Sequence, residues 1–212
     1  MNRQLWTCII AGFGILILTG CAGKGEVVTL NLQAIPPSDA QKVQLPADTI
    51  AVVADFEDAR LDKRRVGARI HQNGGETVFN VPDGNVGAAV GRVVTDYLRK
   101  RGWRVESAKP SPGTGPDSGP HVTISGKVLE LLVNAASSFG STKITSSSKT
   151  VIEAVNAEDG SIYRMALNGA GTHTVVWFDP EDAEALLAES LSNSLEKFVR
   201  ATKVEKKTLS FK

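Results

Sequence analysis

The stretch "HVTISGKVLELLV", residues 121–133, alternates apolar and polar side chains with one change of phase. Apolar side chains occupy even positions up to Val128 and odd positions from Leu129 onward. Successive side chains of a strand point to opposite faces, so one extra residue must be accommodated where the phase changes. The stretch therefore predicts a bent strand with a β-bulge near residues 126–129.

Downstream of this strand, the sequence predicts a hairpin. The runs "TVIEAVNA", residues 150–157, and "SIYRMALNGAGTHTVVW", residues 161–177, flank the turn signal Asp159-Gly160. A serine-rich segment, residues 137–149, lies between the bent strand and this hairpin, and we expect it to be an exposed hairpin tip. The second half is therefore predicted to be a β-meander.

Upstream, two further features indicate strands. Residues 50–54, "IAVVA", form a short apolar run typical of a strand buried on both faces. Residues 66–81 alternate on both sides of Asn73-Gly74-Gly75, residues that tolerate positive φ, and this pattern predicts a β-hairpin. "WRVESA", residues 103–108, predicts a short strand, and "KPSPGTGPDSGP", residues 109–120, predicts a loop with no core-forming residue.

Two segments change to helical spacing. Apolar residues recur every three or four positions over residues 86–98, Asp83 or Asn85 can cap the start, and Gly102 can end the helix. The second helix opens at residues 179–182, "DPED", with a cap, a first-turn proline and two carboxylates at the positive end of the dipole. Its predicted buried stripe is Leu187, Leu191, Leu195 and Phe198.

These elements predict one α+β domain over residues 49–202, followed by a frayed basic tail at 203–212. The expected architecture is a two-layer sandwich, with a mainly antiparallel sheet and both helices packed on one face.

The N-terminus carries an export signal. One basic residue precedes a short apolar run, and residues 1–20 therefore read as a signal peptide. The run ends in Leu18-Thr19-Gly20-Cys21, which resembles the bacterial lipobox. The resemblance implies cleavage between Gly20 and Cys21 and attachment of diacylglycerol and fatty-acyl chains such as palmitate to Cys21. Several chains on one residue hold a protein firmly on a membrane. The alternative is an uncleaved signal anchor, or a signal cut elsewhere.

The residues after Cys21 indicate in which membrane of the cell envelope the protein is anchored. Ala22 stands where an aspartate would favour retention in the inner membrane of lipoproteins, so we expect an outer-membrane protein that faces the periplasm, if the host has two membranes. Residues 21–48 read as the lipidated N-terminus and a tether, because residues 35–48 are polar and proline-rich. Within this tether, residues 27–33 alternate weakly and could dock on the sheet as a strand.

Composition and motifs exclude several functions. A net charge of +1 and 6% aromatic residues argue against a nucleic-acid partner. Neither a metal site nor a cofactor is expected: the three histidines lack ligand spacing, and the acidic group of residues 55–62 lacks the glycine and final glutamate of a calcium loop. The glycines of "GNVGAAVG", residues 84–91, do not have dinucleotide-loop spacing. Gly87 and Gly91, one helical turn apart, indicate instead a close approach of helix to sheet, or to a partner helix.

The lipobox, "TIAVVADFEDAR" at 49–60, the glycine-turn hairpin, the helix ending in "LRKRGW" at 98–103 and "LAESLSNSLEKFV" at 187–199 together resemble the YajG family of bacterial outer-membrane lipoproteins. This resemblance covers residues 49–201. It implies a periplasm-facing lipoprotein and supplies no catalytic residue beyond the acylated Cys21. The loop 109–120 and the basic tail depart from the family pattern.

Three functions follow, in order of preference. The first is a non-enzymatic adaptor or accessory binding module of the envelope, with an envelope protein or peptidoglycan as its partner. The second is an accessory lipoprotein of a lipid or lipopolysaccharide transport complex, which requires an apolar groove between helices and sheet. The third is an envelope hydrolase, although no G-x-S-x-G elbow is present. The candidate binding surface is formed by serine hydroxyls within residues 137–149, namely Ser137, Ser138, Ser141, Ser146, Ser147 and Ser148.

Overall fold

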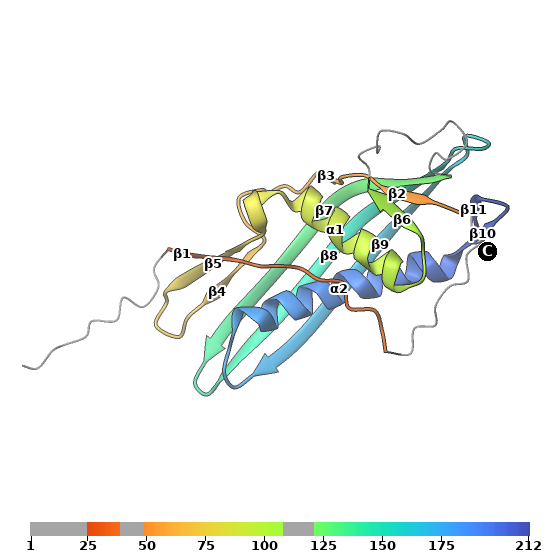
Figure 1. Cartoon of the computed structure of the whole chain (residues 1–212). Coiled ribbons are helices and arrows are strands. Elements are labelled where there is room, and N and C mark those ends of the chain that lie inside the picture. The colour runs from red at the N-terminus through yellow and green to blue at the C-terminus, as the bar shows by residue number, and fades with distance from the viewer. Residues whose placement is uncertain (1–24, 39–48, 108–120) are drawn as a thin grey trace, which may run out of the picture.

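A computed structural model describes residues 25–38, 49–107 and 121–212 (Figure 1). The signal peptide, Cys21 and the predicted loop 109–120 lie outside these residues. The strands are β1 (Glu26–Thr29), β2 (Ala51–Val53), β3 (Glu57–Asp58), β4 (Gly67–Ile70), β5 (Glu76–Asn80), β6 (Val105–Ser107), β7 (Val122–Ser138), β8 (Ser141–Asn156), β9 (Ile162–Val175), β10 (Thr202–Glu205) and β11 (Thr208–Phe211), and the helices are α1 (Val86–Lys100) and α2 (Pro180–Ala201).

Strand β7 is the spine of the sheet, and the predicted bulge is confirmed. Its pairing with β8 shifts register between Val128 and Glu130, which leaves Leu129 as the extra residue. Val128 is fully buried before the shift and Leu131 is buried after it. Leu129 itself is 46% exposed, so the core-facing phase of the second half begins at Leu131 and not at Leu129. The bulge keeps apolar residues on the core face along a strand too long to stay flat.

The expectation of a mainly antiparallel α+β sandwich is wrong. The described chain is mostly β, with a curled, mixed sheet of nine strands and two helices. Strands β2, β3 and β4 all run parallel to β7 along one of its edges, and β1 and β6 also form parallel pairs. Parallel neighbours need a crossover rather than a turn, and α1 provides that crossover between β2 and β6. Hairpins between consecutive strands give only antiparallel pairs, so a prediction built from hairpins misses these parallel pairs.

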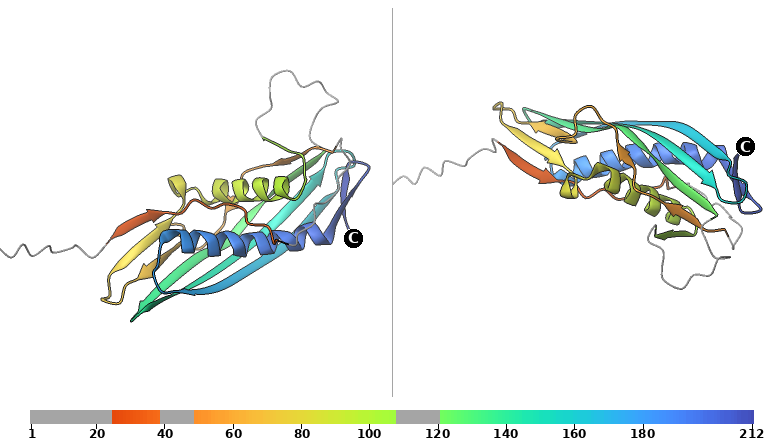
Figure 2. Two further views of the ribbon diagram at one scale, coloured as in Figure 1. Left: turned by 60° about the horizontal axis from the view of Figure 1, so that its bottom comes forward. Right: turned by 90° about the horizontal axis from the view of Figure 1, so that it is seen from above.

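Both helices lie on the same face of the sheet, as the two views of Figure 2 show. Helix α1 begins as predicted, because Asn85 Oδ1 accepts the Ala88 amide at 2.9 Å, and Gly102 follows it with φ of 93°. Helix α2 begins at the predicted "DPED", where Asp182 accepts the Asp179 amide at 3.0 Å. The predicted stripe of α2 is confirmed, since all four of its side chains are at most 2% exposed.

The predicted close approach of α1 to the sheet is confirmed at Gly87. A Cβ there would lie 1.8 Å from the Phe56 carbonyl oxygen, which is an impossible contact. At Gly91 a Cβ would lie 3.5 Å from the Ala54 carbonyl oxygen, an ordinary contact. Only the first glycine is therefore required by packing.

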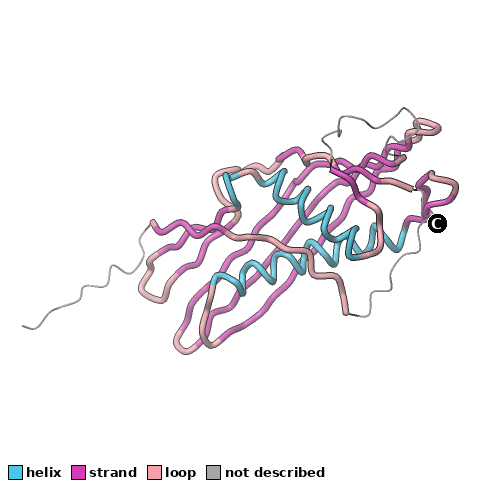
Figure 3. Tube along the Cα trace, in the orientation of Figure 1, coloured by secondary structure: helices cyan, strands magenta, loops and turns pink. Residues whose placement is uncertain are grey.

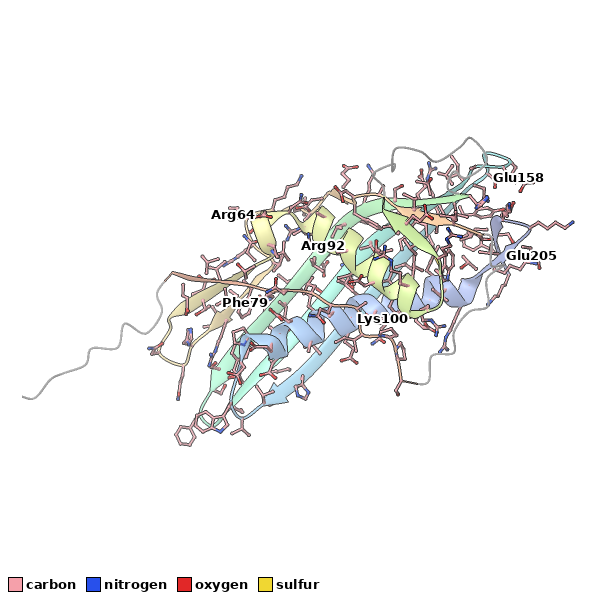
Figure 4. All side chains as sticks on the ribbon, in the orientation of Figure 1. Arg64, Phe79, Arg92, Lys100, Glu158 and Glu205 are labelled. Atoms are coloured by element: carbon pink, nitrogen blue, oxygen red, sulfur yellow. The ribbon has the colours of Figure 1, made fainter. Side chains whose placement is uncertain are left out.

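The predicted tether is in part a packed segment, here named the strap, residues 25–36. Its strand β1 docks on the sheet, as predicted, by parallel pairing with β5. Leu30 and Ala34 are buried, and Lys100 of α1 donates to the Ala34 carbonyl at 2.6 Å (Figure 4). The domain therefore begins well before residue 49.

The C-terminal residues also differ from expectation. Strands β10 and β11 form an antiparallel hairpin rather than a frayed tail. Leu209 is fully buried, and its amide and carbonyl both hydrogen-bond the side chain of Asn156 at 2.8 Å. One buried leucine and one buried amide thus fix a segment that composition alone describes as basic and polar.

Candidate functional site

The strands β7 and β8 run beyond the helices and end in a turn at one pole of the molecule (Figure 3). Here the β4–β5 turn, the β7–β8 turn and the β9–α2 connection surround a hollow of about 760 Å³, here named the tip hollow. It is lined by Arg69, His71, Gln72, Asn73, residues 137–142 and residues 176–178. Three segments far apart in the sequence therefore build one concave surface.

Arg69 and Phe178 line the tip hollow and are connected to the core behind it. The Arg69 guanidinium lies 4.4 Å from the centre of the Phe178 ring, a cation–π contact. The Phe178 ring stacks in turn on buried Phe79 with 6.1 Å between centroids. Arg69 Nε also donates to Ser137 Oγ at 2.9 Å. These contacts connect the tip hollow directly to the hydrophobic core.

The rim of the tip hollow is apolar and exposed. Phe139 is 92% exposed, Trp177 is 86% exposed and Val176 is 69% exposed. Aromatic side chains that remain in water at loop tips contribute nothing to the core, and clustered exposed apolar side chains indicate an interaction surface. No predicted site included these three residues.

The six predicted serines fall into three environments. Ser137, Ser138 and Ser141 line the tip hollow, where Ser137 Oγ also contacts Thr142 Oγ1 at 3.0 Å. Ser147 lies away from it and donates to Glu130 at 2.5 Å. Ser146 and Ser148 are buried. The predicted hairpin tip is present at residues 139–140, but the rest of the serine-rich segment is strand, and its alternation divides the serines between two faces.

The buried serines belong to a seam of small residues beneath α2. Ser146 Oγ hydrogen-bonds the Ser190 hydroxyl and the Leu186 carbonyl of α2. A Cβ on Gly169 of β9 would lie 1.9 Å from the Ser190 carbonyl oxygen. Helix and sheet approach so closely here that only hydrogen and hydroxymethyl side chains fit. Ser146 and Ser148 therefore serve packing and are closed to a ligand.

In the described part of the chain, the hydrogen bonds of the histidine rings do not form an accessible pair of hydroxyl and base. His71 Nε2 contacts the Thr77 hydroxyl at 2.9 Å, but Thr77 is only 4% exposed. His121 Nδ1 accepts the Ile50 amide at 3.0 Å, a structural bond. Across residues 25–38, 49–107 and 121–212, no serine hydroxyl hydrogen-bonds a histidine ring.

Three carboxylates of the acidic group of residues 55–62 form ion pairs. Asp58 accepts two hydrogen bonds from the Arg60 guanidinium, at 2.9 and 3.0 Å, and one from the Arg60 amide at 3.2 Å. Burial acts to raise the pKa of Asp58, but the Arg60 hydrogen bonds and charge outweigh it and lower the pKa. At the surface, hydrogen bonds from Arg64 lower the pKa of Asp62 to about 2. No set of three metal-ligating side chains occurs within the described residues.

A buried ionic cluster joins the two helices. Tyr97 of α1 donates to Glu196 of α2 at 2.5 Å, Arg101 lies 3.2 Å from the same carboxylate, and Arg200 lies 2.7 Å from it. Burial and then the Glu196 hydrogen bond raise the pKa of Tyr97. Burial acts to raise the pKa of Glu196, but hydrogen bonds from Tyr97 and Arg200 and the arginine charges lower it. This cluster is structural, since it lies inside the domain.

Sequence reasoning missed both the ionic cluster and the apolar rim. Glu196 lies within the predicted helix, but nothing local shows that it faces Tyr97, 99 residues earlier. The sequence contains only a weak signal of the rim. Phe139 precedes a turn glycine and Trp177 lies two residues before a helix cap, and neither position requires a core side chain.

None of the described helices is both long enough and apolar enough to span a bilayer. No family model matches the chain, and no curated protein resembles it in sequence.

Solved structures give the following likenesses. XCC0632 from Xanthomonas campestris, of family model DUF330, is 9% identical over 82% of this chain and 92% of its own, with a TM-score of 0.48. A putative neuraminyllactose-binding hemagglutinin homolog from Helicobacter pylori is 10% identical over 85% of this chain and 94% of its own, with a TM-score of 0.41. Lipoprotein GNA1162 from Neisseria meningitidis is 12% identical over 71% of this chain and 98% of its own, with a TM-score of 0.34. Every TM-score is below 0.5, so the YajG resemblance stays a prediction.

Proposed function

We propose that this chain is a lipid-anchored lipoprotein of the bacterial envelope that acts as a non-enzymatic adaptor or accessory binding module. The anchor is Cys21, and Ala22 favours the outer membrane, with the domain facing the periplasm. The partner is an envelope protein or peptidoglycan.

The observation that carries this proposal is the packing of the strap. Four residues separate Cys21 from Glu26, where β1 begins. From there the strap is fixed: the Asn31 amide donates to Glu184 at 2.7 Å and the Ile35 amide donates to Ser192 at 2.9 Å. An anchor at Cys21 is thus joined almost directly to a folded body, which suits a module that presents one surface at a fixed height above a membrane.

Two features of the domain weigh against the alternatives. A lipid carrier needs an apolar groove between helices and sheet, and close packing at Gly87 and at Gly169 leaves no room for an acyl chain there. A hydrolase needs an accessible hydroxyl beside a base, and the hydroxyl that contacts His71 is the buried one of Thr77.

Metabolic labelling with an alkyne fatty acid tests the anchor. Wild-type protein should be labelled and fractionate with the outer membrane, whereas a Cys21→Ser variant should be unlabelled. An unlabelled wild type would overturn the proposal.

The binding role is tested by proximity crosslinking in living cells and by pull-down on isolated peptidoglycan. Wild type should be captured. A variant with alanine at Ser137, Ser138 and Ser141 is compared with the control Ser147→Ala, outside the tip hollow, and loss of capture in the triple variant alone would assign the partner to the tip hollow. Equal capture by both variants would remove the tip hollow from the binding surface.

A further inference from the structure

The strap enters the domain at the same pole as the tip hollow. The Gly25 amide donates to the Glu76 carbonyl at 3.3 Å, and Glu26 pairs with Thr77. Glu76 directly follows the β4–β5 turn, whose residues 71–73 line the tip hollow. The first described residues of the chain therefore lie beside the β4–β5 turn, which forms one wall of the tip hollow.

The chain between Cys21 and this pole is short. Five residue steps from Cys21 to Glu26 span at most about 17 Å when fully extended. The predicted anchor therefore cannot reach the opposite pole, where the β8–β9 turn lies (Figure 1). The anchor therefore lies within this distance of Glu26, on the side of the domain where the β4–β5 turn forms one wall of the tip hollow.

The rim has the chemistry of a membrane interface. Phe139, Val176 and Trp177 project from two adjacent turns and are at least 69% exposed. Tryptophan is enriched at the membrane–water interface, where its amphipathic ring sits at the level of the lipid headgroups, and phenylalanine is common on the apolar face of segments that lie in that interface. Exposure of these three side chains to water at one pole costs free energy, whereas their burial in a bilayer interface is favourable.

We propose that the tip hollow is the membrane-facing pole of the domain, with Phe139, Val176 and Trp177 seated in the interfacial region of the bilayer that carries the anchor. The placement rests on the proposed lipid anchor. It goes beyond that function because it fixes which surface meets lipid and leaves the opposite pole and the outer face of the sheet to a partner.

The charges of this pole determine the expected lipid dependence. Arg69 and Lys143 are outnumbered by the three carboxylates at the start of α2, Asp179, Glu181 and Asp182. With no excess of positive charge, attraction to anionic headgroups contributes little, and burial of the apolar rim is the driving force. We expect similar seating on phosphatidylcholine vesicles and on vesicles that contain phosphatidylglycerol.

Tryptophan fluorescence provides a direct test. Apart from Trp6 in the predicted signal peptide, the chain has only Trp103, which is 5% exposed, and Trp177. The acylated protein is reconstituted in phosphatidylcholine vesicles whose acyl chains are brominated near the glycerol end. A Trp103→Phe variant reports on Trp177 alone, and a Trp177→Phe variant is the matched control that reports on buried Trp103.

We expect bromolipid to quench Trp177, with a blue shift of its emission, and to leave Trp103 unchanged. Phe139→Ser in the Trp103→Phe background should weaken the quenching. Ile162→Ser, which alters an exposed side chain near the opposite pole, should not. Unchanged thermal unfolding of both serine variants shows that the fold is retained.

Mass spectrometry of the same sample separates the two proposals. Protein without lipid on Cys21 overturns the anchor and, with it, the membrane placement. Lipidated protein whose Trp177 is not quenched by bromolipid overturns the placement alone. If that Trp177 is also shielded from iodide, the rim contacts protein, either a second copy or a partner, and the placement is again refuted.

Discussion

Replacing Gly87 by alanine should destabilise the domain, whereas the same change at Gly91 should stabilise it. Alanine is better than glycine in a helix interior by about 1 kcal/mol, so propensity alone favours both changes. At Gly91 the new methyl group meets the Ala54 carbonyl oxygen at 3.5 Å, and the full gain is expected. At Gly87 the methyl group would lie 1.8 Å from the Phe56 carbonyl oxygen, and both partners are backbone.

Helix α1 must then retreat from the sheet by roughly 1.5 Å, and overpacking of this kind costs about 1–3 kcal/mol or more. The retreat also breaks the hydrogen bond from the Phe56 amide to the Gly87 carbonyl, 3.4 Å long. We expect a net loss of about 2 kcal/mol for Gly87→Ala.

Thermal unfolding by circular dichroism, on protein purified in detergent, measures both variants. In a domain of this size each kcal/mol moves Tm by about 2–4 °C, so Gly87→Ala should melt about 4–8 °C lower and Gly91→Ala about 2–4 °C higher than wild type. If both variants shift Tm in the same direction, the inferred contact between α1 and the Phe56 carbonyl is not made.

Three further predictions concern the ionic cluster and the bulge. Glu196→Ala leaves buried Arg101 without its carboxylate and should cost about 3–5 kcal/mol in urea unfolding, whereas Tyr97→Phe removes one hydrogen bond to a charged group and should cost about 1.5–3 kcal/mol. An equal loss in the two variants would contradict the cluster geometry. The pKa of Glu196 is lowered from 4.5 in the folded state, so its stabilisation is complete above that pH and is lost as the pH falls below it. Unfolding free energy should therefore fall less steeply in acid for Glu196→Gln than for wild type; parallel slopes would show that this carboxylate does not contribute. Deletion of Leu129 brings Val128 and Leu131 into one unbroken alternation, so the core face of β7 is kept and the variant should fold, with a lower Tm because the bend of the strand is lost; Leu129→Ser should leave Tm nearly unchanged. A deletion variant that fails to fold would show that Leu129 is not the extra residue of the bulge.

The sequence was sufficient for features that depend on neighbours along the chain. Asn85 caps α1 through the amide three residues ahead, Gly74 takes the positive φ of its hairpin turn, and the phase change before Leu131 produces the bulge. Each depends on interactions within a few residues, so a pattern of side-chain types is enough to predict it. The candidate site was only half predicted, since three of the six serines line the tip hollow and none of the apolar rim residues was identified.

Other features were decided by tertiary structure. The alignment of β2, β3 and β4 along β7 joins residues more than 60 positions apart. Serines 146 and 148 are buried because α2 lies over them, although the same alternation on an uncovered face would expose hydroxyls to solvent. Local sequence fixes which side chains share a face of an element. Which element covers that face depends on how the whole chain buries its apolar surface, and no short stretch contains that information.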